Sequence, residues 1–122
     1  MADDFVGIII EESLESKAVL KKVKILKTKV ERVTEKHRTS WLKQWTLHKV
    51  EIPEDQAKTV AMELSSALDP TYWYADFKNT VKHYIVFRGK IFCIDRKSKV
   101  QYDEAKAYGL ALGIPSYQVW ES

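Results

Sequence analysis

The sequence predicts an α+β fold, with a mixed, mostly antiparallel sheet and two helices on one of its faces. Short runs rich in β-branched and aromatic residues are typical of strands, and two longer segments repeat apolar residues at helical spacing. From residue 45 these patterns follow the order strand, helix, three strands and helix, after two N-terminal strands. The nearest named arrangement is a ferredoxin-like split βαβ core with an N-terminal strand extension.

The first strand is expected at 5–10, where FVGIII is short and rich in β-branched residues. Residues 17–36 carry both a helical apolar stripe and a strand-like alternation. A strand at 22–33 is favoured because Val, Ile and Thr are frequent there, with Leu26 as a register slip or bulge. A loop at 35–40 then leads into a strand at 45–52.

The first helix begins at Pro53, which suits the first helical position, and ends near residues 69–70. Its apolar residues recur at the spacing of a single helix face. They are Ala57, Val60, Ala61, Leu64 and Leu68.

Three short strands follow as a meander at 72–78, 83–88 and 91–95. Gly89 and Lys90 are expected to form a type II′ turn, with Gly at its first central position. Ser98 and Gln101 form a capping-box pattern that predicts a second helix, whose Ala105, Tyr108 and Leu112 share one face and which stops at Gly113. Residues 118–120 suit a last edge strand.

Length and composition indicate one domain over residues 1–122. The chain has 20 Lys and Arg, 17 Asp and Glu, and a formal net charge of +3. This balance excludes collagen-like, low-complexity and disordered classes. The positive charge is concentrated in segments 17–49 and 78–99, which could form one anion-attracting surface if they meet in space.

Several sequence features indicate a cytoplasmic protein without disulfides. The single Cys93 excludes an intramolecular disulfide framework. The acidic N-terminus does not resemble a signal peptide, and no segment approaches the roughly 20 apolar residues that span a bilayer. No membrane partner is therefore expected.

Three segments resemble a family of small uncharacterised prokaryotic α+β proteins: WLKQWTLH at 41–48, WYADFK at 73–78 and GIP at 113–115. The resemblance covers most of the chain and implies one compact domain. It implies no activity, cofactor or catalytic residue.

A candidate ligand site follows from strand alternation. Tyr74, Asp76 and Lys78 share one face of their strand, because successive side chains point to opposite faces. Trp45 and His48 lie on the earlier strand and Arg88 on the next one. If these faces coincide, the residues converge on one pocket, in which Asp76 orients His48 or accepts from Arg88.

Catalytic, metal and cofactor motifs are not found. Cys93 lies in an apolar strand, where a buried, inert thiol is expected. His37, His48 and His83 lack the spacing of metal ligands, and the four glycines form no phosphate-binding loop. No catalytic residue, metal or cofactor is therefore assigned.

The resulting hypothesis is a non-catalytic binding module, expected to form a homodimer, that recognises an anionic small molecule or a protein partner through an aromatic and basic sheet face. One alternative is a protein that binds single-stranded RNA or DNA, with lysines on phosphates and Trp45, Trp73 and Tyr74 stacked on bases. Another is a hydrolase or transferase that uses His48 with Asp76 or Cys93.

Overall fold

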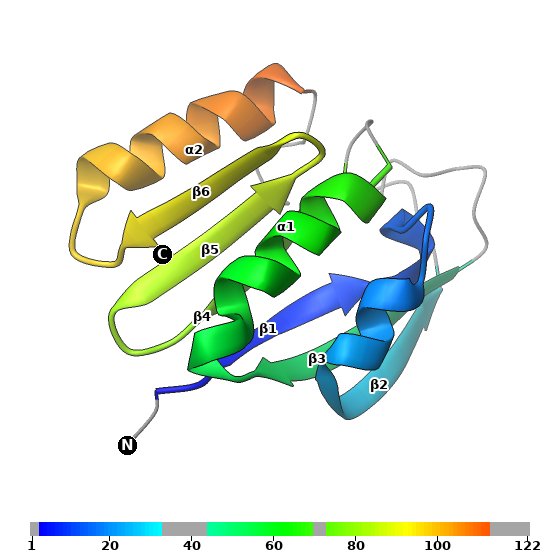
Figure 1. Ribbon diagram of the computed structural model, residues 1–122. Helices are drawn as coiled ribbons and strands as arrows, with labels where there is room; N and C mark the ends of the chain where they lie inside the picture. The colour runs from blue at the N-terminus through cyan, green and yellow to red at the C-terminus, as the bar shows by residue number, and fades with distance from the viewer. Residues whose placement is uncertain (1–2, 33–43, 70–72, 113–122) are drawn as a thin grey trace.

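A computed structural model describes residues 3–32, 44–69 and 73–112. Its strands form one six-stranded sheet in the order β2-β3-β1-β4-β5-β6 (Figure 1). Every neighbouring pair is antiparallel. The predicted α+β class, with an antiparallel sheet and two helices, is confirmed.

The N-terminal strand occupies the middle of the sheet. β1 (Phe5–Ile10) lies between β3 (Gln44–Ile52) and β4 (Ala75–Lys78). Two short 3₁₀ helices, η1 (Glu11–Ser13) and η2 (Ala18–Lys22), link β1 to β2. β1 is therefore hydrogen-bonded to β3 on one side and to β4 on the other.

The ambiguous segment after η2 is a strand, as the sequence favoured. β2 (Lys24–Arg32) pairs with β3, and its register shifts between Ile25 and Lys27. The predicted irregularity at Leu26 is therefore confirmed. β-branched residues decide this segment, because their stiff side chains fit a pleated strand better than a helix.

The first helix is preceded by a short turn that the sequence did not predict. Pro53 is extended, with φ −55° and ψ 140°, and precedes the turn η4 (Glu54–Gln56). α1 (Ala57–Ala67) begins only after it, so the prediction that Pro53 occupies the first helical position is wrong. The five predicted apolar residues of this face are all buried.

The meander is confirmed with one correction to its turn. β4 is followed by β5 (Lys82–Phe87) and β6 (Lys90–Asp95). Because Phe87 pairs with Lys90, the central turn residues are Arg88 and Gly89. Gly89 takes the second position with φ 74°, whereas a type II′ turn needs Gly at the first.

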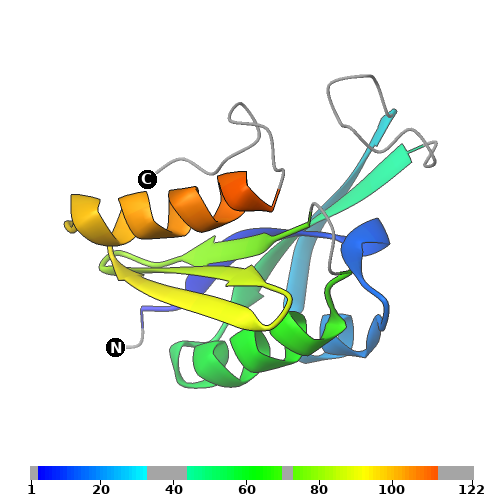
Figure 2. The same ribbon diagram turned by 90° about the horizontal axis from the view of Figure 1, so that it is seen from above.

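The second helix is capped as expected but covers the other face of the sheet. The Ser98 hydroxyl caps α2 (Lys99–Ala111) by accepting from the backbone N–H of Gln101. Val86 packs in the core beneath α1, while its neighbours Ile85 and Phe87 pack with α2. The two helices therefore lie on opposite faces (Figure 2), and the prediction of one shared face is wrong.

The ferredoxin-like arrangement is not confirmed. β3 and β4 are both antiparallel to β1, so they run parallel to each other and β3-α1-β4 is a split βαβ unit. However, α2 covers the opposite face from α1, whereas both helices would cover one face in the predicted arrangement.

The loop at 35–40, the helix stop at Gly113 and the strand at 118–120 lie outside the described residues. Within the described ranges, neither helix has the length and apolar character needed to cross a membrane.

Candidate functional site

Half of one sheet face is open and carries lysines. α2 covers β5 and β6 on this face, whereas the β2-β3-β1 side has no described helix over it. Residues that pair directly across an antiparallel sheet point to the same face, so the strand registers define rows of neighbours. One such row contains Lys27, Lys49, Ile8 and Asp76.

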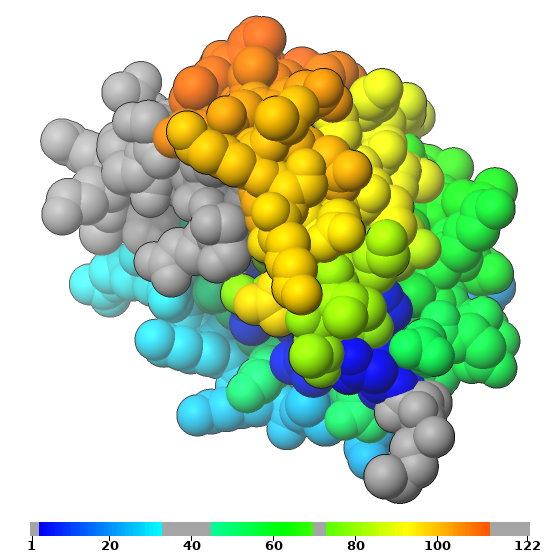
Figure 3. Space-filling view, turned by 90° about the vertical axis from the view of Figure 1, so that its left-hand side faces the viewer, coloured from blue at the N-terminus to red at the C-terminus, as the bar shows by residue number. Residues whose placement is uncertain are grey.

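The lysine face is defined here as Lys24, Lys27, Lys29 and Lys49. Lys27 and Lys49 stand directly opposite each other on β2 and β3, where Cβ atoms are about 5 Å apart. All four residues are exposed. Figure 3 shows β2, in light blue and cyan, at the molecular surface below the orange α2.

Three acids, Glu31, Glu51 and Asp76, share this face but leave the central lysines without a carboxylate partner. Glu51 stands opposite Lys24, and a Glu31 oxygen lies 3.5 Å from the Lys29 ammonium. Within the described ranges, no carboxylate lies within 4.0 Å of the Lys27 or Lys49 ammonium. These two adjacent cations therefore form an electropositive centre on the open face.

The six predicted site residues do not form one pocket. Asp76 and Lys78 lie on the same sheet face as the lysines, because Asp76 is opposite Ile8 and Lys78 is opposite Val6. The Asp76 carboxylate lies close enough to Tyr74 to help burial raise the pKa of that phenol. These three residues are brought together as alternation predicts.

His48 and Arg88 lie elsewhere, whereas Trp45 stands opposite Glu31 and so lies on the same sheet face as the lysines. His48 is opposite Ile9, which packs beneath α1, and so points to the opposite face from Asp76. Arg88 also lies near α1, where it donates to the Leu68 carbonyl at 2.9 Å and pairs with Glu15. Trp45 packs against Trp73 with ring centroids 5.2 Å apart. The predicted convergence is wrong, because the register of β1 places His48 and Asp76 on opposite faces.

His48 joins a carboxylate and a hydroxyl that the sequence did not connect. Its Nε2 lies 3.2 Å from Glu11 Oε1, and its Nδ1 lies 2.9 Å from Thr28 Oγ1. The proposed pairing of His48 with Asp76 or Cys93 is not made. Asp76 points to the other face, and Cys93 lies on the far edge strand β6.

The hydrogen bond with His48, assisted by Lys17, holds the pKa of Glu11 below its usual range. A lowered folded-state pKa stabilises the fold above the unfolded-state pKa, and this stability is lost as pH falls through the folded value. We therefore expect Glu11→Gln to lower the free energy of unfolding by about 1 kcal/mol at pH 7. The deficit should shrink steadily below pH 4.5.

Urea unfolding at several pH values measures this effect. Glu104→Gln is the control, because Glu104 is exposed on α2. The free energy of unfolding of the Glu104→Gln variant should match that of the parent protein at every pH. A Glu11→Gln deficit of equal size at pH 3 and pH 7 would contradict the argument.

A second histidine is held in the same way on the face covered by α2. His83 is fully buried; its Nε2 lies 2.8 Å from Asp76 Oδ2 and its Nδ1 lies 2.9 Å from the Tyr102 hydroxyl. A carboxylate can only accept, so a neutral ring satisfies both bonds when Nε2–H donates to Asp76 and Nδ1 accepts from Tyr102. Burial raises the pKa of Tyr102, and the Arg96 guanidinium opposes that rise.

Cys93 is exposed, so the prediction of a buried thiol is wrong. It stands opposite Tyr84 on the face that α1 covers, but β6 is the edge strand there. Burial, together with the neighbouring Cys93 thiol, raises the pKa of Tyr84 to about 12. The apolar neighbours of Cys93 in sequence did not indicate its exposure, because the sequence does not show that β6 is an edge strand.

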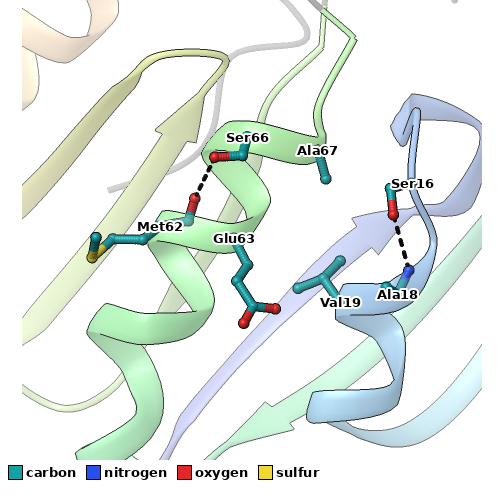
Figure 4. A pocket seen from close by; sticks show the side chains of 7 residues that line it. All are labelled: Ser16, Ala18, Val19, Met62, Glu63, Ser66 and Ala67. Carbon is teal, nitrogen blue, oxygen red and sulfur yellow. Dashed lines mark hydrogen bonds between the residues drawn. The ribbon is translucent and has the colours of Figure 1, made fainter.

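Two shallow hollows lie along α1. The first has a volume of about 400 Å³ and lies between α1 and η2 (Figure 4). Its polar side chains are engaged locally, since Glu63 accepts from Lys22 and the Ser66 hydroxyl donates to the Met62 carbonyl. The second, of about 420 Å³, includes Arg88. Both hollows are on the opposite face from the lysines.

Comparisons with known proteins give no further assignment. No protein-family model, curated protein or solved structure matches this chain. The candidate site therefore depends on its own geometry.

Proposed function

We propose that this protein is a binding module that recognises an acidic segment of a partner protein on the lysine face. The observation that carries the proposal is the direct opposition of Lys27 and Lys49. Like charges directly opposite in an antiparallel pair lower stability. A carboxylate of a partner placed between the two ammonium groups would relieve this repulsion.

The neighbouring groups favour a protein partner over a small molecule. Ile8 lies next to Lys49 in the same row and is 39% exposed, so apolar contact is available beside the cations. The face is open, and the two hollows along α1 lie on the opposite face. A small ligand gains most of its affinity from enclosure, whereas an extended partner can use an open surface.

The same surroundings favour protein over nucleic acid. Single-stranded nucleic acid binds where exposed rings can stack on bases. The large exposed side chains of the described residues are aliphatic, while Trp73 is buried and Trp45 packs against it. The predicted aromatic and basic face is thus replaced in the proposal by a basic and aliphatic one.

Lys27→Glu tests this proposal without damaging the fold. The new carboxylate would stand opposite Lys49, so we expect stability to rise by about 0.5 kcal/mol. Binding of a fluorescent, glutamate-rich peptide should weaken at least fivefold and should weaken further at higher salt. Fluorescence anisotropy at 50 and 200 mM salt, with urea unfolding alongside, measures both quantities.

The matched control is Lys106→Glu, which makes the same charge change at an exposed position of α2. It should leave peptide affinity within twofold of the parent protein. An equal loss of peptide affinity in both variants would mean that only net charge matters. It would rule out the lysine face as the binding site. Tighter binding of oligothymidine than of the peptide would favour the nucleic-acid alternative.

The proposed site of action is the cytoplasm. The exposed thiol of Cys93 is suited to a reducing compartment, where thiols are kept reduced.

A further inference from the structure

We infer that β2 takes up the acidic segment as an additional strand, so that the sheet extends from six strands to seven. The inference rests on the proposed function and specifies the conformation and sequence pattern of the partner. Strand addition is a common way for an exposed sheet edge to bind an extended peptide.

The outer edge of β2 is long and accessible. β2 has nine residues and ends the sheet, and no described residue pairs with its outer side. All of its residues except Glu31 are exposed. Figure 2 shows β2 and β3 extending beyond the layers formed by the two helices. An edge strand of this kind presents unpaired backbone N–H and C=O groups to an incoming chain.

The two faces of β2 differ, and this difference specifies the pattern of the partner. Lys27 and Lys29 point to the open face, opposite Lys49 and Leu47 respectively. Ile25 and Val30 point to the other face and are 43% and 55% exposed. An added strand would place acidic residues beside the lysines and apolar β-branched residues beside Ile25 and Val30. The matching segment therefore alternates Asp or Glu with Val or Ile.

A second copy of β2 would fit this edge poorly. In antiparallel self-pairing, the register that joins all nine residues places Lys27 opposite Lys29 and Lys24 opposite Arg32. Like charges directly opposite are destabilising, and lysines on edge strands commonly prevent such self-association. The charges that disfavour a second copy attract an acidic strand.

N-methylated peptides provide the test. The parent probe is a fluorescent peptide with four Glu alternating with three Val, acetylated and amidated at its ends. In a strand, alternate residues direct their N–H groups to the same edge, and an added strand uses only one of its two edges. One probe is therefore methylated on the backbone nitrogens of its second, third and fourth Glu residues. A second probe is methylated on the backbone nitrogens of its three Val residues. Both keep the side chains and charge of the parent.

We expect one methylated probe to bind at least tenfold more weakly than the parent and the other to bind within threefold of it. Hydrogen exchange of the β2 amides should slow on addition of the parent probe. Parent-like binding of both methylated probes, with unchanged β2 exchange, would overturn strand addition while leaving the proposed function intact. Failure of the parent probe to bind would instead overturn the proposed function.

Discussion

Gly7→Ala is expected to prevent formation of the native sheet. A Cβ on Gly7 would lie 2.6 Å from the Phe77 Cα, and closer still to the Asp76 carbonyl oxygen. These are atoms of the neighbouring strand backbone, so no side-chain rotation relieves the clash. β1 and β4 would have to separate in the middle of the sheet, which places the cost above about 4 kcal/mol.

Circular dichroism and urea unfolding measure this effect. Gly89→Ala is the matched control, because its Cβ would meet nothing within 4 Å. That residue has φ 74°, so its substitution should cost only about 1 kcal/mol through backbone conformation. A Gly7→Ala variant that unfolds at the same urea concentration as the parent would show that β1 and β4 do not approach as described.

His83→Leu is expected to lower the free energy of unfolding by about 3 kcal/mol. His83 is fully buried, and its two ring nitrogens bond Asp76 and Tyr102. Leucine fills most of the space but leaves the carboxylate and the hydroxyl without this partner. The cost of unsatisfied polar groups exceeds the gain from added apolar contact.

A double-mutant cycle with Asp76→Leu separates pairing from packing. If the pair acts as a unit, the double variant should be more stable than the sum of the two single effects predicts. His48→Leu is the control with the same side-chain change. It should cost less, because the Glu11 and Thr28 partners of His48 reach solvent. Additive effects at Asp76 and His83 would contradict a coupled pair.

The elements of the fold could be predicted where one segment contains its own signal. α1 follows from a single apolar stripe, and the Ser98 cap follows from a local spacing. β2 is confirmed with its bulge because side-chain type and alternation agree there. The helix faces could not be predicted this way, since apolar stripes do not say which face of a sheet they meet.

The prediction of the candidate site was incomplete because the sequence does not reveal the register between distant strands. Alternation correctly groups Asp76 with Lys78, but a shift of one residue between strands changes which residues share a face. The insertion of β1 between β3 and β4 decides that His48 lies opposite Ile9 and away from Asp76. This insertion has no local sequence signal.

The sequence contains a weak signal for the pairing of His83 with Asp76, which the sequence analysis did not use. The two residues lie on neighbouring strands joined by a short turn, so a hairpin register could have placed them together. Tyr102 is 19 residues beyond His83 and lies on a helix, and its approach depends on α2 covering that face. The lysine pair likewise depends on the irregularity at Leu26, which sets Lys27 opposite Lys49.

The central position of β1 also constrains the order in which the chain can fold. β1 is made first during synthesis, yet it bonds to β3 and β4, whose residues reach Lys78. The meander β4-β5-β6 closes over short turns, whereas β1 must wait for partners distant in sequence and pays a larger loop-closure entropy. Until Lys78 has emerged from the ribosome, the apolar side chains of β1 have no complete sheet to enter, and this exposure makes the unfinished chain prone to aggregation.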